Sequence, residues 1–259
     1  MNKKLNLYVA GNGRPLLLLH SLLSDRESFD RILPALSANY RVVVPDLPGF
    51  GASPASTGLP ETADRIAGLI DAFASDGEAI VLGNGFGAFV ALQTAIRHPA
   101  LLLRLVLVGC GARFSDQGRE AFRKMAAAAR AGGLEAVVET AMNRLFAPKF
   151  QADNPDLMED RRKAFLLMDL EVFCNACSTL AELDLSTEAA KVAAPTLVVV
   201  GDADQATPLP MARDLVERLP DGQLRVLKGC AHVPPLQAPD RLLALVDEFL
   251  GCSVPAGLK

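Results

Sequence analysis

Short apolar runs alternate with longer amphipathic segments along the first 110 residues. The runs contain few polar residues, which is typical of strands in a parallel sheet that helices cover on both faces. The segment Thr62–Ala74 has apolar residues at helical spacing and therefore predicts a helix with one buried face. This alternation indicates βαβ units. The predicted strands are Leu5–Val9, Pro15–Leu19, Arg41–Val44, Ala79–Leu82 and Leu103–Val108.

Between residues 112 and 194 the pattern changes to helical periodicity alone. The strand pattern then resumes at Pro195–Val200 and Gln223–Leu227, and Arg241–Leu250 predicts a closing amphipathic helix. We therefore expect one structural unit, with residues 1–111 and 195–259 forming an α/β core and residues 112–194 forming a helical cap inserted into it. The helical stretches of this cap are Arg119–Ala131, Leu134–Leu145 and Leu157–Leu180.

Composition narrows the possible partners. The chain has 259 residues, half of them apolar, and 26 Lys and Arg against 30 Asp and Glu give a net charge of -4. Because no basic cluster stands out, we expect no nucleic-acid partner. The longest stretch without charge, Ala79–Ile96, is broken by three glycines and several polar residues, so we expect no membrane partner.

The first 14 residues and the cysteines predict the compartment. The chain begins with two lysines but lacks the apolar segment of a signal peptide, and charge returns at Arg14, so we expect a cytoplasmic protein. Five cysteines are an odd number in a chain long enough to form a core without disulfides. We therefore expect reduced thiols, and we interpret the pair Cys174 and Cys177 as structural rather than redox-active or metal-binding.

Polar residues that follow the predicted strands are the candidates for chemistry, because ligands of open parallel sheets bind at the carboxyl ends of the strands. The second run is followed by His20, Ser21 and Leu22, and the run Ala79–Leu82 by a glycine-rich turn. Late in the chain, Asp204 and His232 lie in the segments GDADQATP and GCAHVP.

In chain order, the segments LLLLHSLLSD, VVVPDLPGFGAS, VLGNGFGAFVALQTAIRHP, LVLVG, PTLVVVGDADQATP and GCAHVPPLQAPD resemble the α/β-hydrolase superfamily over essentially the whole length. The resemblance implies an α/β-hydrolase fold: a mostly parallel sheet of about seven strands, flanked by helices and carrying a helical cap. The segment FCNACSTLAELDLSTEAAKVAAPTLVV and the HSL after the second strand are similar to the 3-oxoadipate enol-lactonase branch.

The chain departs from the family at its nucleophile. The family has Gly-x-Ser-x-Gly at the turn between a strand and a helix, whereas this chain has Gly83-Asn84-Gly85-Phe86-Gly87. Gly85 has no side chain that could attack a carbonyl, so an acyl-enzyme cannot form there. Glycine also accepts the positive φ of this turn at little cost. We expect Gly83 and Gly87 to be needed because strand and helix approach closely.

The resemblance assigns roles to the other site residues. Asp204 would orient His232, and the backbone N–H groups of Leu22 and Phe86 would form an oxyanion hole. His232 would then activate a water in the room left by the missing side chain, or remove a proton from the substrate. No metal or cofactor is implied. We expect Ser21, Arg113, Phe114, Phe146 and Met168 to line the substrate pocket.

Two other hypotheses remain open. The chain could be a catalytically silent protein that binds a ligand, or Gly85 could be an engineered replacement of serine that inactivates a conventional hydrolase. Cys110 and Ser21 lie at the same sheet edge as the turn, but neither has the geometry of the missing nucleophile. We expect a small-molecule substrate and a monomer or homodimer, with the N-terminal edge of the sheet available for dimerisation.

Overall fold

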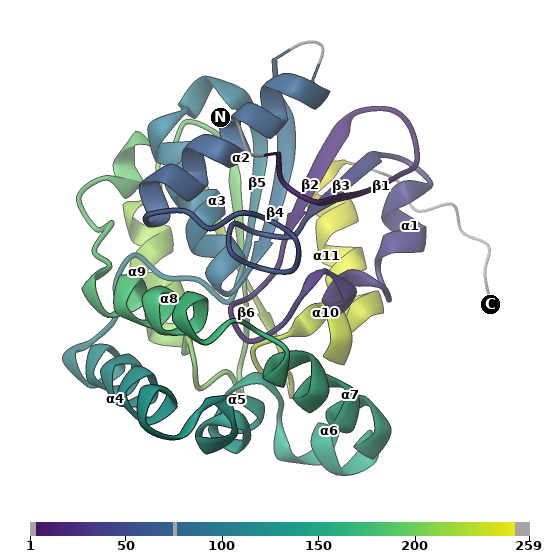
Figure 1. The fold of residues 1–259 in the computed structure, drawn as a ribbon. Helices are drawn as coiled ribbons and strands as arrows, with labels where there is room; N and C mark the ends of the chain where they lie inside the picture. Colours follow the sequence, from purple (N-terminus) through teal and green to yellow (C-terminus); the bar gives the residue numbers. More distant parts are fainter. Residues whose placement is uncertain (1–3, 75–76, 252–259) are drawn as a thin grey trace.

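The computed structural model describes residues 4–74 and 77–251, which form a three-layer α/β fold (Figure 1). A seven-stranded sheet has the order β1-β3-β2-β4-β5-β6-β7, and every neighbouring pair except β1 and β3 is parallel. This architecture confirms the predicted mostly parallel sheet of seven strands with flanking helices. The strands are β1 (Leu7–Ala10), β2 (Pro15–Leu19), β3 (Arg41–Pro45), β4 (Ala79–Asn84), β5 (Leu102–Val108), β6 (Thr196–Gly201) and β7 (Gly222–Leu227).

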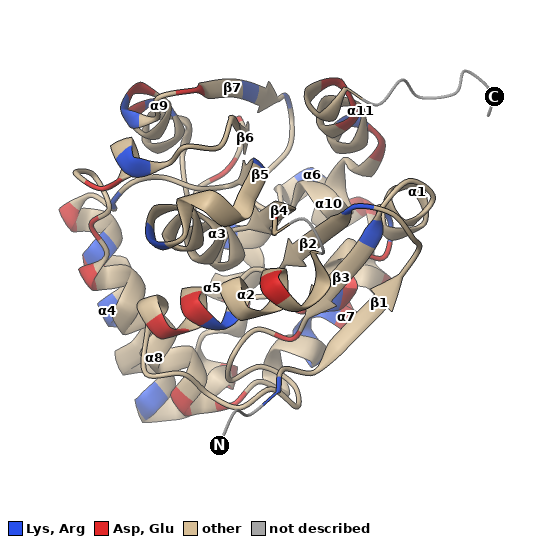
Figure 2. Cartoon of the chain, turned by 90° about the horizontal axis from the view of Figure 1, so that it is seen from above, with Lys and Arg blue, Asp and Glu red and all other residues tan. Residues whose placement is uncertain are grey.

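Successive side chains of the central strands enter two separate cores. On one face, Leu17 and Val81 pack with helices α2 (Leu59–Phe73), α3 (Phe86–Arg97) and α9 (Leu209–Arg218). On the other face, Leu16 and Ile80 pack with α1 (Leu33–Ser37) and α11 (Pro239–Leu250). Viewed from above, the helices lie on both sides of the sheet, and β2, β4 and β6 carry no charged residue (Figure 2). Burial on both faces explains why these strands have no polar alternation.

The N-terminal strand differs from the prediction. We predicted a buried strand over Leu5–Val9, but β1 begins at Leu7, runs antiparallel to β3, and exposes Tyr8 by 45% and Val9 by 42%. The reason is its position at the edge of the sheet, where one side has no strand partner and the covering layer is incomplete.

The segment 112–194, between β5 and β6, consists of helices packed beside the sheet (Figure 1). The predicted single stretch Leu157–Leu180 is two helices, because the Asp169 carboxylate accepts a hydrogen bond from the Val172 N–H and begins a new helix after a bend of 95°. The helices are α4 (Asp116–Gly132), α5 (Val138–Leu145), α6 (Pro148–Asp153), α7 (Pro155–Leu166) and α8 (Leu170–Glu182).

Ion pairs of Arg161 join this segment to the rest of the chain. The Arg161 guanidinium on α7 pairs with Asp25 at 2.9 Å and Glu27 at 3.0 Å, both in the segment after β2. Within the segment, Arg113 near its start forms an isolated antiparallel bridge with Asp184 near its end. Among the described residues, no single helix is long and apolar enough to cross a membrane; only the bent pair α7 and α8 would pass that test together, by length and composition.

Candidate active site

The loops after β6 and β7 bring Asp204 and His232 into contact. The imidazole Nδ1–H of His232 donates to Oδ2 of Asp204 at 2.8 Å, and the two side chains are 6% and 0% exposed. Burial alone would raise the pKa of the Asp204 carboxyl, but the charge of His232 and hydrogen bonds from His232 and Thr207 hold this pKa below its ordinary value. The ionised carboxylate fixes the tautomer of His232 and leaves Nε2 as the free ring nitrogen.

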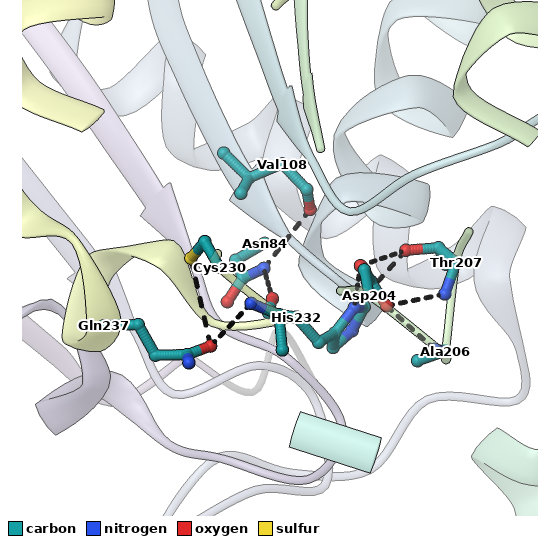
Figure 3. A network of polar contacts seen from close by, with 9 residues as sticks. Asn84, Val108, Asp204, Ala206, Thr207, Cys230, His232 and Gln237 are labelled. Atoms are coloured by element: carbon teal, nitrogen blue, oxygen red, sulfur yellow. Dashed lines mark hydrogen bonds and ion pairs between the residues drawn. The ribbon is translucent and has the colours of Figure 1, made fainter. Parts of the chain in front are cut away.

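Several groups fix this pair in place (Figure 3). The Asp204 carboxylate accepts hydrogen bonds from the N–H groups of Ala206 and Thr207 at 2.8 and 2.9 Å, and the Thr207 hydroxyl donates to Oδ2 at 2.8 Å. The Asn84 side-chain amide donates to the carbonyl of His232 at 2.8 Å. The first three bonds hold the Asp204 carboxylate in place, and the fourth anchors the backbone of His232.

Gly109, directly after β5, packs against the His232 ring. It has a φ of +62°, and a Cβ atom there would lie 2.9 Å from both Cε1 and Nδ1 of His232. Glycine satisfies both demands, because it accepts positive φ and occupies no space on the ring side. The last turn of α5, in the segment 112–194, also contacts His232. The His232 N–H donates to the carbonyl of Leu145 at 3.1 Å.

The glycine-rich turn joins β4 to α3 with Gly85 at its tip. Gly85 has φ +55° and ψ -119°, a conformation that L-residues rarely adopt. The neighbouring glycines serve close packing as predicted: a Cβ on Gly83 would lie 2.3 Å from the Gly87 carbonyl oxygen, and one on Gly87 would lie 2.1 Å from that of Leu19. The turn therefore has the strained backbone expected of a strand-to-helix elbow.

The space above Gly85 is occupied by two side chains rather than left open. An ideal Cβ on Gly85 would lie 2.4 Å from Oγ of Ser21 and 2.6 Å from Nε2 of His232. The expectation that the missing side chain leaves room at this position is therefore wrong for the Cβ site itself. Ser21 and His232 instead converge there from the loops after β2 and β7.

A small pocket of about 30 Å³ lies beside this point. Its lining includes six predicted site residues: Ser21, Leu22, Gly85, Phe86, Phe114 and His232. The N–H groups of Leu22 and Phe86 donate no hydrogen bond to any protein group in the described part of the chain. The remaining walls are mainly apolar: Leu23, Phe89, Phe122, Leu180 and Ala206, with Thr207 and Arg144 as further polar residues.

Three predicted pocket residues lie elsewhere. Arg113 is exposed and faces Asp184 and Asp214, whose pKa values its charge helps to lower. Phe146 is buried in the segment 112–194 and stacks on Phe150 with ring centroids 5.7 Å apart. Met168 lines a separate cleft of about 550 Å³ between α7 and the loops after β2 and β3.

Thr207 and Arg144 are two polar residues of the cavity that the sequence reasoning did not identify. Thr207 lies three residues after Asp204, and that spacing is the signal of a side chain folding back to cap a carboxylate. Arg144 lies at the end of an amphipathic helix with no motif around it, so only the fold brings it to the site.

The cysteines do not supply a replacement nucleophile. Cys110, Cys174, Cys177 and Cys230 are buried and unpaired, and burial raises the pKa of each thiol, to about 12 for Cys177 and Cys230. A thiol with a raised pKa is a poor nucleophile. Cys252 lies outside the described residues. Among residues 4–74 and 77–251, no three His, Cys, Asp or Glu side chains form a group that could hold a metal ion.

Comparison with known proteins places this geometry in a family. The family model described as "Alpha/beta hydrolase family" matches residues 16–245. The 2-hydroxymuconate semialdehyde hydrolase of Pseudomonas sp. strain CF600 is 31% identical and aligns over 95% of this chain and 89% of its own.

Two solved structures are similar throughout. A thermophilic esterase from Thermogutta terrifontis has a TM-score of 0.86 at 29% identity and covers 95% of this chain and 93% of its own. The enol-lactonase from Burkholderia xenovorans LB400 has a TM-score of 0.88 at 25% identity, covering 95% of this chain and 96% of its own. With a family match over most of its length, the chain belongs to the alpha/beta hydrolase family and is a hydrolase-like enzyme.

Proposed function

We propose that the protein hydrolyses a small ester, lactone or related carbonyl compound through His232 and Asp204, without a covalent intermediate on the elbow. In this proposal Gly85 occupies the position where the family has its serine nucleophile. The observation that carries it is the His232–Asp204 hydrogen bond, which leaves Nε2 directed at the Gly85 turn. The relatives' names, which include an esterase and an enol-lactonase, support a carbonyl substrate.

The proposed reaction uses water as the nucleophile. Nε2 of His232 takes a proton from the water, and the resulting hydroxide attacks the carbonyl carbon of the substrate. The N–H groups of Leu22 and Phe86 stabilise the negative charge that develops on the carbonyl oxygen. The intermediate then collapses, the carbon–oxygen bond to the leaving group breaks, and His232 returns its proton to the departing alkoxide. The products are an acid and an alcohol.

The size of the cavity supports water attack over direct removal of a substrate proton. A cavity needs roughly 10–15 Å³ to hold a water, and the space beside Gly85 measures about 30 Å³. We propose that Ser21 positions this water, because its Oγ and Nε2 of His232 both lie beside the Cβ site of Gly85, at 2.4 and 2.6 Å. Ser21 would then act as a positioning residue for the nucleophile.

We further propose that residues 112–194 act as a cap over a core formed by residues 1–111 and 195–259. Pockets that hold small ligands usually measure about 300–1,000 Å³, so a substrate needs more space than the present cavity of about 30 Å³ offers. Arg144 and Leu180 form part of its wall and belong to this segment. Movement of the cap relative to the core is therefore the proposed route by which the substrate enters.

The test is turnover of short aryl esters and an enol-lactone by the wild-type protein, His232→Ala and Gly85→Ser in parallel. We expect activity in the wild type and a loss of about 10²- to 10⁴-fold in His232→Ala, which is the usual contribution of a general base. Thermal melting of each variant controls for folding.

The same experiment separates the two other hypotheses. Activity that appears only in Gly85→Ser would indicate a hydrolase inactivated at one position, and the mechanism proposed above would be wrong. Absence of turnover in all three proteins, with ligand binding retained in His232→Ala, would favour a silent binding protein.

A further inference from the structure

Arg161 on α7 links the proposed cap to the segment that follows β2. Its guanidinium donates from Nη1 to Asp25 at 2.9 Å and from Nη2 to Glu27 at 3.0 Å. Elsewhere α7 packs mainly against α5 and α6, which belong to the same segment 112–194, and a cleft of about 550 Å³ lies between α7 and the loops after β2 and β3. The two ion pairs are therefore a polar contact that α7 makes with the core.

The two acids that Arg161 binds come directly after the turn that carries a proposed oxyanion donor. A hydrogen bond from the Ser24 N–H to the Ser21 carbonyl, 3.3 Å long, closes this turn. Asp25 follows at once and begins the 3₁₀ helix Arg26–Phe29, because its carboxylate accepts the Glu27 N–H at 3.0 Å. The same carboxylate oxygen accepts the hydrogen bond from α7. The contact with α7 therefore fixes the chain where the turn ends.

We infer that Arg161 is a positioning residue for the oxyanion hole: by holding its two acids, it keeps the turn after β2 in place, so that the Leu22 N–H stays beside Gly85. This inference rests on the proposed function. Leu22 and Ser21 line the pocket at Gly85, and Asp25 lies three residues beyond Leu22. An oxyanion donor stabilises the transition state only if it is already placed where the charge develops. Docking of the proposed cap on the core then completes the oxyanion hole.

The exposure of the three side chains offers a way to separate positioning from stability. The side chains of Asp25 and Glu27 are 36% and 62% exposed, so water can replace the guanidinium at both carboxylates. Arg161 is only 9% exposed, and its aliphatic stem has about the shape of a methionine. Replacing a buried arginine by an apolar residue of similar volume is often neutral or stabilising when no charge is left buried. Arg161→Met should therefore keep the fold and lose the contact.

The first test measures kcat and KM of Arg161→Met on a short aryl ester that the wild type hydrolyses, well below the Tm of both proteins. Removal of one oxyanion donor costs about 10²- to 10³-fold in kcat, and a displaced donor should cost less, so we expect a loss of about tenfold. KM should stay within about twofold, because the oxyanion contact strengthens only in the transition state. Arg161→Lys should recover part of the loss, since it keeps the charge without the paired donors.

Arg162→Met is the matched control. Arg162 is the next residue of α7, but it binds Glu139, which belongs to the same segment 112–194. It should leave kcat unchanged. An equal loss in both variants, or a loss in Arg161→Met that only follows a lower Tm, would mean a structural role and overturn the inference. An unchanged kcat in Arg161→Met would overturn it as well.

The partner side of the contact provides a further check. Asp25→Asn still caps the 3₁₀ helix, because asparagine is as good a cap as aspartate, but it lacks the charge that binds Arg161. This change should lower kcat in the wild type and have little further effect in Arg161→Met. Additive losses would contradict a shared role of the two residues.

A second readout does not depend on turnover. Hydrogen exchange at the Ser24 and Ser28 N–H groups, which donate to carbonyls of this segment, should be at least about tenfold faster in Arg161→Met and unchanged in Arg162→Met. If no ester is hydrolysed, the proposed function fails on its own, and the exchange rates still decide whether Arg161 holds the turn. Exchange as slow as in the wild type, or equally fast in the two variants, would overturn the inference.

Discussion

The two sides of the candidate active site are constructed differently. On one side, Asp204 and His232 are held by side-chain hydrogen bonds to each other and to Thr207, and Nε2 of His232 is left free for chemistry. On the other side, Gly85 at the tip of the turn offers only backbone groups, and the neighbouring Ser21 hydroxyl has no hydrogen-bond partner among the described residues.

The difference indicates that the chain retains the groups needed for proton transfer and lacks the group needed for a covalent intermediate. A base needs an oriented ring and an ionised acid, and both are present in detail. Oxyanion binding needs only N–H groups, which a glycine turn provides as well as a serine turn. A covalent nucleophile needs a side chain that this turn lacks. The following changes would break or sharpen this contrast.

The largest effect is expected from Asp204→Asn. An amide at this position no longer stabilises the charged ring or fixes its tautomer, so hydrolysis should fall by about 10³- to 10⁴-fold. Steady-state kinetics on an ester that the wild type hydrolyses provides the measurement. Asp202→Asn is the control, because Asp202 is exposed and accepts only the Gly229 N–H. A comparable loss in the control would show that the loop as a whole, rather than the pairing with His232, is responsible.

The next effect concerns the glycine behind the imidazole. Gly109→Ala places a Cβ 2.9 Å from the His232 ring, whereas Gly229→Ala has a similar φ of +69° and open space around its Cβ. Both should lose about 1–2 kcal/mol from backbone strain, and Gly109→Ala should lose a further 1–3 kcal/mol or so from overpacking. Urea unfolding measures the difference. Equal destabilisation would mean that the ring moves aside freely.

A smaller effect is expected from the energetic coupling between substitutions at Gly85 and at Ser21. Gly85→Ser brings a Cβ against Ser21, so Ser21→Gly should relieve part of the resulting strain. We expect a coupling energy of about 1 kcal/mol between the two substitutions in a double-mutant cycle of unfolding free energies. Additive effects would show that the Ser21 side chain rotates away without cost.

The smallest effect is a pH dependence from His20, which lies beside Ser21. Its Nδ1–H donates to the Ser21 carbonyl at 3.0 Å, and its Nε2 accepts from the Leu47 N–H at 3.1 Å. Burial lowers the pKa of His20 below 6.5. The unfolded chain therefore binds a proton first as the pH falls below about 6.5, and stability decreases through that window. His20→Gln should make the loss of Tm between about pH 7 and 5 less steep; an unchanged slope would contradict this.

Much of the fold could be predicted because the sequence repeats its pattern. The strands β2, β4 and β6 have runs without charged residues, and the order of the motifs around Gly85, Asp204 and His232 is that of the α/β-hydrolase superfamily, which implies the topology. The edge strand β1 was less predictable. Its residues are as apolar as those of a central strand. In the structure, however, β1 pairs antiparallel with β3 at the edge of the sheet, and two of its side chains are exposed.

The site was predictable where the loops after strands form it and less so where the segment 112–194 contributes. Leu22, Phe86 and Phe114 lie within six residues of the ends of β2, β4 and β5 and reach the cavity. Arg113 also follows a strand, but the bridge to Asp184 holds its backbone so that the side chain is exposed. Arg144 reaches the cavity through the packing of α5 against the His232 loop. The hydrogen bond between them, from His232 to Leu145, spans 87 residues of sequence, which periodicity does not encode.

The glycine at the elbow also affects whether a hydrolase of this kind can be detected by covalent labelling. Surveys that detect active hydrolases with fluorophosphonate reagents depend on a serine oxygen at the elbow that forms a stable phosphorus ester. Gly85 has no such oxygen. A protein that hydrolyses its substrate with water alone would pass through these surveys unlabelled, so an inventory of hydrolases based on covalent labelling would omit it even when it is abundant and active.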